Sequence, residues 1–212
     1  EKFYVIPGLG NLHGRLAFNS SWVAINAFFN APFREIGSVR VLNTWLMICA
    51  VFLFTGRINK LLKNHFTLTN LVTLLMAFFM LLYFPGDSSY GTDLPGTLFC
   101  WFAVMFFLVS LEDAPGKLNR IFCLFFICTA VTIKLSNLPF LLLLIPIYFV
   151  PSSRNRKDIS FFLGGIFLIF FPWIVRNIIL SGCLVYPVPF LRIPWLDWAM
   201  PRENIQAEYE SV

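Results

Sequence analysis

Four short polar stretches interrupt an otherwise apolar sequence, and three of them hold residue types that bind or transfer charged groups. Asp93, in SSYGTDLPG, supplies a carboxylate that can act as a general base or hold a divalent metal ion. Lys134, in KLSNLP, and Arg176, in PWIVRNIILSG, are the two cations closest to apolar segments. Arg offers a planar fork of donors and Lys a point charge, a pairing suited to phosphate or pyrophosphate. Asn177 adds a further donor beside Arg176.

The fourth stretch, PGLGNLHGRLAFNSSW, is rich in glycine and covers residues 7–22. Its glycines allow the backbone to adopt positive φ and to approach a ligand closely. His13 and Arg15 are suited to bind a phosphate or to position an acceptor; the alternative is a surface turn with solvated charges. The spacing G-x-G-x-x-x-G is not the dinucleotide fingerprint and no strand precedes it, which excludes a Rossmann site.

The other candidates also have structural explanations that the sequence leaves open. Thr92-Asp93-Leu94-Pro95 is a common helix start, so Asp93 can serve as a cap alone. Lys134 and Arg176 can place their charges at the lipid headgroups while their stems stay in apolar surroundings. With two His and no C-x-x-C pair, the sequence offers no zinc or haem ligand set, and no cofactor is identifiable from it.

Composition indicates what must position these residues. Hydrophobic residues make up 58% of the 212 residues and charged residues only 13%, against about 25% charged in soluble domains. This excludes a disordered chain, a nucleic-acid-binding domain and an ordinary soluble enzyme. Several charge-free windows approach the ~20 residues needed to cross a bilayer. The sequence therefore predicts an all-α fold, a polytopic transmembrane helical bundle.

We expect about six spans, with a break in the long apolar stretch 121–150. As one helix this stretch would be ~45 Å long, and the residue before Pro139 is disfavoured in helical geometry. Segment 20–33 is too short to span, and we expect an interfacial helix with Trp22 at the headgroups, or a loop packed on the bundle. The expected spans are 41–56, 67–84, 95–110, 119–134, 138–150 and 159–176.

The charges sort the loops between the two sides of the membrane. Loops 57–66, 111–120 and 151–158 carry eight basic and three acidic residues, whereas the longer remainder carries eight of each. The positive-inside rule therefore places these loops in the cytoplasm. The chain then divides into an extracytoplasmic loop with the interfacial helix (1–40), a transmembrane bundle (41–178) and an extracytoplasmic segment (179–212).

The polar stretches also resemble a family of uncharacterised bacterial polytopic membrane proteins, which is similar to the GT-C class of integral membrane glycosyltransferases. The resemblance rests on VIPGLGNLHGRLAFNSSW, SYGTDLPG, TIKLSNLP, PWIVRNIILSGCLVYP and LDWAMP. It implies a GT-C-like fold in the cytoplasmic (inner) membrane, with the site on the extracytoplasmic face. It also implies transfer of a sugar from a polyprenyl-phosphate carrier to a glycan or lipid acceptor, in assembly of the cell envelope.

GT-C enzymes usually carry a catalytic acidic residue in the first outer loop, after the first membrane helix. This chain begins at Glu1, beyond the expected position of that helix. The resemblance therefore implies a fragment that lacks the first helix, the principal carboxylate and C-terminal helices. In what remains, it implies a base at Asp93, with Lys134 and Arg176 stabilising the phosphate leaving group.

Two other functions stay open at this point. The broken stretch at Pro139 also suits a transporter or flippase of a lipid-linked or anionic substrate. However, the predicted spans hold only scattered Asn, Thr and Ser, whereas transport requires access from both sides. A non-catalytic membrane assembly subunit is the other alternative, and it predicts tolerance to substitution at every polar site named above.

Overall fold

The structure is a computed structural model, and it describes residues 5–30, 41–83, 91–112, 117–149 and 156–211. Every regular element within these ranges is helical, and the one β-bridge is the isolated pair Cys183 and Arg192. The all-α prediction is therefore confirmed for the described residues.

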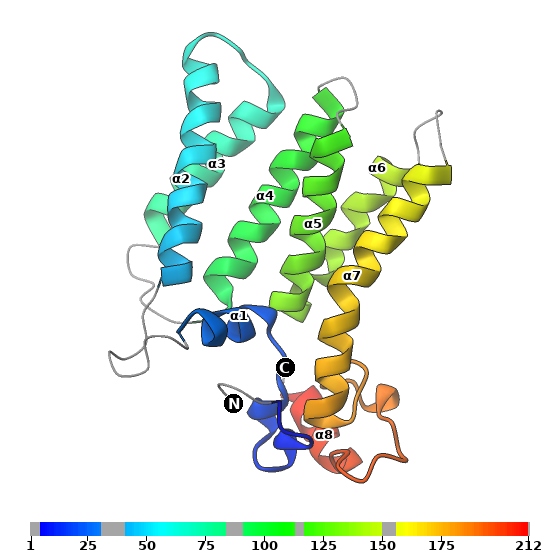
Figure 1. Cartoon of the computed structure of the whole chain (residues 1–212). Helices are drawn as coiled ribbons and strands as arrows, with labels where there is room; N and C mark the ends of the chain where they lie inside the picture. Colours follow the sequence, from blue (N-terminus) through cyan, green and yellow to red (C-terminus); the bar gives the residue numbers. More distant parts are fainter. Residues whose placement is uncertain (1–4, 31–40, 84–90, 113–116, 150–155, 212) are drawn as a thin grey trace.

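The helices alternate in direction along the chain, so that the bundle has two ends (Figure 1). The α-helices are α1 (Ser21–Asn30), α2 (Val41–Leu62), α3 (Leu68–Tyr83), α4 (Asp93–Glu112), α5 (Lys117–Ile133), α6 (Leu144–Phe149), α7 (Arg156–Ser181) and α8 (Arg202–Glu210). The 3-10 helices are η1 (Leu9–Asn11), η2 (Gly14–Ala17), η4 (Leu135–Leu143) and η5 (Pro189–Leu191).

Three of the described helices are long and apolar enough to cross a membrane, which indicates a membrane protein. They correspond to Leu42–Leu62 in α2, Asp93–Glu112 in α4 and Ser160–Ser181 in α7. Helix α3 has 16 residues, so its length of about 24 Å falls short of a ~30 Å hydrocarbon core when the helix is taken alone.

Helix α4 forms the centre of the bundle, with α5 packed along it (Figure 1). Aromatic rings fill the α4–α5 interface: Phe126 lies edge-on to Phe102, with 5.2 Å between ring centroids, and stacks on Phe106 at 5.6 Å. Helices α2, α3 and α7 instead direct large apolar side chains outward, among them Phe52 and Leu168, each 75% exposed. Such a surface is unusual for a soluble monomer and is expected where lipid surrounds the protein.

The break predicted inside 121–150 is confirmed. Helix α5 ends at Ile133, and Lys134 is extended with φ −147° and ψ 120°. The helix expected to begin at 138 instead begins at Leu135 and is a 3-10 helix as far as Leu143. Pro139 lies inside it, and a proline ring there would clash with the carbonyl four residues earlier in an α-helix.

Helix α1 lies across one end of the bundle, below α4 and α5 in Figure 1. The helix predicted within 20–33 is present, but Trp22 is only 6% exposed and packs against Phe99 of α4. The Trp22 indole N–H donates to the Asn43 side-chain oxygen of α2 at 2.8 Å. The Trp22 ring thus completes the core between α1, α2 and α4 and packs α1 onto the bundle.

The turn at the opposite end, between α2 and α3, is closed by two backbone hydrogen bonds. Asn64 has a left-handed φ of 64°, and its N–H donates to Leu61 O while that of His65 donates to Lys60 O. This is the Schellman arrangement that ends many helices. The first turn of α3 is held to α4, since the Thr69 N–H donates to a Glu112 carboxylate oxygen at 2.8 Å.

Beyond the end of the bundle that carries α1, residues 5–20 pack against residues 182–211 to form what we call the terminal lobe (Figure 1). The lobe encloses a small core made of Ala17, Cys183, Tyr186, Met200 and Ile205. The sequence predicted two separate extracytoplasmic segments at the start and the end of the chain. In the structure, the described parts of these segments pack against each other as one unit.

The last turn of α7 anchors the lobe. Its free carbonyls receive hydrogen bonds from both segments: Ile179 O from the Gly8 N–H at 2.8 Å and Ser181 O from the Met200 N–H at 3.0 Å. Gly8 adopts φ 69°, as the glycine pattern allowed. Satisfying these end carbonyls fixes the lobe to the bundle.

Candidate functional site

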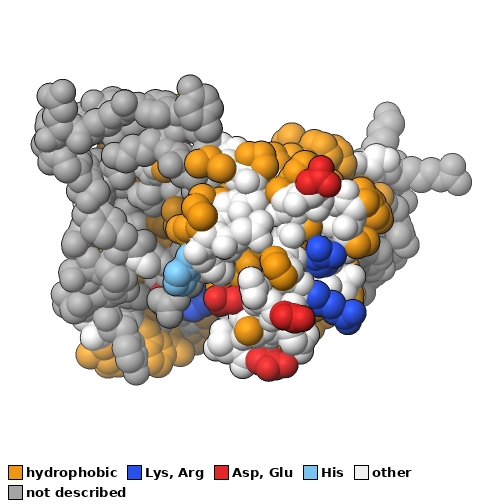
Figure 2. Space-filling view, turned by 90° about the horizontal axis from the view of Figure 1, so that it is seen from below, with side chains coloured by type: hydrophobic (Ala, Val, Ile, Leu, Met, Phe, Trp, Pro, Cys, Tyr) orange, Lys and Arg blue, Asp and Glu red, His pale blue; other side chains and the backbone are white. Residues whose placement is uncertain are grey.

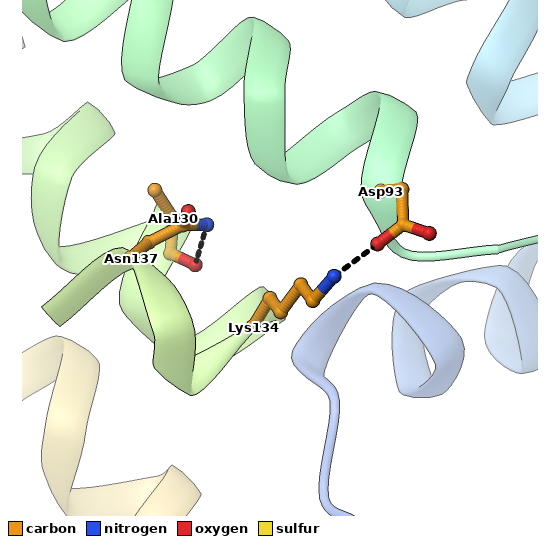
Figure 3. A network of polar contacts seen from close by, with 4 residues as sticks. All are labelled: Asp93, Ala130, Lys134 and Asn137. Carbon is orange, nitrogen blue, oxygen red and sulfur yellow. Dashed lines mark hydrogen bonds and ion pairs between the residues drawn. The ribbon is translucent and has the colours of Figure 1, made fainter. Parts of the chain in front are cut away.

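The candidate site is built around an ion pair between Asp93 and Lys134 (Figure 3). Asp93 is the first residue of α4, and Lys134 occupies the extended position after α5. Because α4 and α5 run in opposite directions, the start of one lies beside the end of the other. The Lys134 side chain reaches across and donates to Asp93 Oδ1. With 47% of the lysine and 70% of the aspartate side chain exposed, the pair is open to a ligand.

The backbone around Lys134 is fixed by a double hydrogen bond at Ala130. The Ala130 carbonyl accepts from the Lys134 N–H and from the Asn137 side-chain amide, each at 3.0 Å. Figure 3 shows Asn137 directed to Ala130 while Lys134 points to Asp93. A Cβ on Gly96 of α4 would lie 3.0 Å from the Asn137 amide nitrogen. The absence of a side chain at Gly96 therefore lets α4 and η4 approach each other closely.

Arg176 is held by a residue that the sequence reasoning did not single out for the site. Its guanidinium donates to Asn19 Oδ1. The Asn19 amide donates to the Trp173 carbonyl at 2.7 Å, and the Trp173 indole N–H donates to the Asn19 carbonyl at 2.7 Å. Asn19 is thus locked against α7 by three hydrogen bonds and holds the half-buried Arg176 in place.

Residues 19–21 connect the surroundings of the two predicted cations. Asn19 binds Arg176 of α7, and the Ser21 hydroxyl is 2.9 Å from the Thr132 hydroxyl of α5, two residues before Lys134. Since the Thr132 hydroxyl also donates to the Thr129 carbonyl, Ser21 is the donor between the two hydroxyls. One short segment therefore fixes the ends of α5 and α7 that carry Lys134 and Arg176.

Asn177 does not face solvent. It is 1% exposed, on the side of α7 that also buries Trp173 and Ser181, and its side-chain nitrogen has no hydrogen-bond partner. The role of Asn177 as an added donor to a substrate stays a prediction, and the structure places its amide inside the protein beside Arg176. Ser20, which lies between Asn19 and Ser21, likewise has a buried hydroxyl without a hydrogen-bond partner.

His13 lies apart from the ion pair, in the terminal lobe, where it lines a pocket together with residues of α8. The side chain of Arg15 is outside the described part of the structure. Figure 2 views this lobe from below and shows acidic and basic side chains interspersed with apolar ones. His13 therefore belongs to the lobe pocket, whose lining does not include Asp93, Lys134 or Arg176.

Two groups in the lobe core have perturbed acidity. Burial raises the pKa of the Tyr186 hydroxyl, and the negative charge of Glu208 raises it further. Burial also raises the pKa of the Cys183 thiol. Both groups therefore keep their protons near neutral pH. Among the described residues, no three His, Cys, Asp or Glu side chains gather in a way that could hold a metal ion.

Comparison with known proteins supplies a family. A family model described as a domain of unknown function (DUF8201) matches residues 1–212. The chain belongs to the DUF8201 family. No curated protein matches the chain, and no solved structure does. The site of this DUF8201 chain is therefore defined by its own geometry.

Proposed function

We propose that this protein is an integral membrane glycosyltransferase that takes a sugar from a polyprenyl-phosphate donor on the extracytoplasmic face. The observation that carries the proposal is the exposed pair of Asp93 and Lys134, which joins a carboxylate and a cation at the ends of two apolar helices. The same bundle end holds a second cation, Arg176, in a fixed position. A base beside cations is what a transfer from a phosphate leaving group requires.

The proposed membrane topology has six spans: α2, α3, α4, α5, η4 with α6, and α7. It places the basic loops between these helices in the cytoplasm. The end that carries Asp93, Lys134 and the terminal lobe then faces outward, where polyprenyl-linked sugars are used. The cytoplasmic, inner membrane of a bacterium fits this orientation and the resemblance to GT-C enzymes.

Donor binding would exchange one ionic contact for another. An exposed ion pair contributes only ~0–1 kcal/mol, so a donor phosphate can replace Asp93 at Lys134 at little cost. Arg176, with its guanidinium oriented by Asn19, provides a second contact for the phosphate oxygens. The apolar surface of the bundle is suited to the polyprenyl tail.

The released carboxylate then has a role in the transfer. Asp93 accepts the proton of the acceptor hydroxyl, and the acceptor oxygen forms a bond to the anomeric carbon. The bond from this carbon to the phosphate oxygen breaks, and the phosphate leaves with the electron pair. Lys134 and Arg176 stabilise the negative charge that develops on the leaving group.

The test is sugar transfer by the full-length protein in liposomes, measured with radiolabelled polyprenyl-phosphate sugars. We expect Asp93→Asn and Arg176→Ala each to lower the rate at least a hundredfold. The matched controls are Asp197→Asn and Arg202→Ala, two exposed charges of the terminal lobe, which should retain the rate. Undiminished transfer in both site variants would reject this site, and movement of intact donor across the bilayer without transfer would favour a flippase.

A further inference from the structure

The terminal lobe contains a pocket of about 350 Å³ that the ion pair does not share. It lies between the turn at residues 10–14 and one face of α8. Its lining comprises Gly10, Asn11, Leu12, His13, Gly14, Met200, Asn204, Ala207, Glu208 and Ser211. The volume is within the range of small-molecule sites, about 300–1,000 Å³.

The lining determines which ligand chemistry fits. Among the lining residues that the structure describes there is no Lys or Arg, and Glu208 contributes a carboxylate, so an anionic ligand such as phosphate is disfavoured there. Asn204 offers both a carbonyl oxygen and an amide donor, and His13 offers a ring nitrogen. A hydroxyl group that donates to a carboxylate forms a strong, charge-assisted hydrogen bond. The polar groups therefore suit an uncharged ligand rich in hydroxyls.

Apolar groups complete the pocket, since Leu12, Met200 and Ala207 line it together with the polar side chains. A saccharide ring has apolar C–H faces and hydroxyls around its edge, and it needs both kinds of surface. A polyprenyl segment has no hydrogen-bonding groups and would instead leave the polar groups of the pocket without partners, at a cost of ~1–3 kcal/mol for each one buried.

The pocket is held in shape by the lobe that surrounds it. Asn11 is fixed by a hydrogen bond from its amide to the Trp198 carbonyl at 2.8 Å. Met200 is 1% exposed and belongs to the lobe core. The Glu208 carboxylate lies against Gly14, where a Cβ would be 2.2 Å from Oε1, so that only glycine leaves room for this position of the carboxylate.

We propose that this pocket binds an uncharged, hydroxyl-rich saccharide and serves as the acceptor site. The acceptor role rests on the proposed glycosyltransferase function, whereas the binding of a saccharide does not. The lobe projects from the same end of the bundle as Asp93 and Lys134, so an acceptor chain held in the pocket lies on the side where transfer would occur (Figure 1).

The experiment measures binding without any donor. The full-length protein in detergent is titrated with methyl glucoside, methyl mannoside, N-acetylglucosamine and their disaccharides, and saturation-transfer NMR reports contact. Inorganic phosphate is the anionic comparison. We expect saturable binding of at least one saccharide, weakened at least tenfold by Glu208→Gln and abolished by Ala207→Phe, which fills the pocket.

The matched control is Glu203→Gln, which makes the same change on α8 outside the pocket lining and should leave binding intact. Thermal unfolding identifies any variant that fails to fold, and Asn204→Ala provides a further variant of the lining. Binding of phosphate in place of saccharides, or saccharide binding unchanged in folded Ala207→Phe protein, overturns the proposal. Saccharide binding without sugar transfer would reject the proposed glycosyltransferase function and support the pocket as a saccharide-binding site.

Discussion

At the scale of single residues, the pairing of Asp93 with Lys134 separates stability from activity. Both side chains are largely in solvent, so their attraction is screened and contributes about 0–1 kcal/mol. The proposed transfer, in contrast, depends on each of them separately. A residue that matters for chemistry and little for folding can be recognised by measuring both quantities in the same variants.

We therefore predict that Asp93→Asn and Lys134→Ala each change the free energy of unfolding by less than ~1 kcal/mol. Both variants should lower the rate of sugar transfer. For Asp93→Asn we expect a loss of about 10²–10⁴-fold, the range typical of a lost general base. Chemical denaturation in detergent and the transfer assay supply the two values. A large loss of stability in Asp93→Asn would assign the pair a structural role instead.

Asn19 should behave in the opposite way. Asn19→Ala removes two of the three hydrogen bonds, because it deletes the side-chain acceptor for Arg176 and the side-chain donor to the Trp173 carbonyl, whereas the backbone acceptor for the Trp173 indole remains. Because these groups are partly buried, we predict a loss of ~1–3 kcal/mol in the free energy of unfolding. Asn19→Asp keeps an acceptor for Arg176 and should lose less. Equal losses in the two variants would show that the contact with Arg176 contributes nothing.

The sequence showed the charged residues but not their partners. Asp93, Lys134 and Arg176 stand out because charges are rare in an apolar chain. Asn19 does not stand out, since its partners Trp173 and Arg176 are more than 150 residues away along the chain. Glu208 was missed for a similar reason: only the folding of α8 against residues 10–14 gives it a pocket to line.

At the scale of elements, two glycines set how closely the glycine-rich turn packs against the rest of the terminal lobe: Gly10 against the lobe core and Gly14 against α8. A Cβ on Gly10 would lie 2.4 Å from Met200 Sδ and 2.7 Å from Ala17 Cβ, inside the lobe core. A Cβ on Gly14 would instead meet the far end of the flexible Glu208 side chain. The two positions therefore respond differently to the same methyl group.

Gly10→Ala should lower the free energy of unfolding by ~1–3 kcal/mol, because an overpacked core must shift to accept the methyl group. Gly14→Ala should leave stability nearly unchanged but displace Glu208 and weaken saccharide binding. Thermal unfolding and the NMR titration test the pair side by side. If Gly14→Ala bound saccharides as well as the parent protein, the position of Glu208 would not matter for the ligand.

The elements themselves were largely predictable. Apolar runs fixed the approximate positions of α2, α3, α4, α5 and α7, and Pro139 correctly indicated the break after α5. The 3-10 geometry of η4 was not predicted. Apolar periodicity over so few residues does not distinguish a 3-10 helix, with its hydrogen bonds between residues three apart, from an α-helix, with hydrogen bonds between residues four apart. Helix α8 was not predicted because it lies in a polar tail and depends on the lobe for its packing.

At the scale of the whole molecule, the two ends of the bundle differ in what they carry. One end has the α2–α3 turn and the basic residues around it. The other has α1, the ion pair and the terminal lobe (Figure 1). This asymmetry makes the proposed orientation in the membrane directly testable.

In a variant with its five native cysteines replaced, we predict that Phe190→Cys is labelled by a membrane-impermeant maleimide in intact cells and Lys63→Cys is not. Phe190 is 80% exposed in the lobe, and Lys63 follows the end of α2. Trp195→Cys, at a second exposed lobe position, should repeat the result. Permeabilised cells, in which all three should react, supply the control. Labelling of Lys63→Cys alone in intact cells would show that the orientation in the membrane is the opposite of the proposed one.

The 3-10 geometry of η4 also sets how far a short piece of chain can extend. Nine residues at ~2.0 Å each and the six of α6 at ~1.5 Å each advance about 27 Å along a common axis. An α-helix would need about 18 residues to cover the same depth. A tighter winding thus lets these fifteen residues approach the ~30 Å thickness of a hydrocarbon layer, while Lys134 stays fixed at the end of α5 through Ala130.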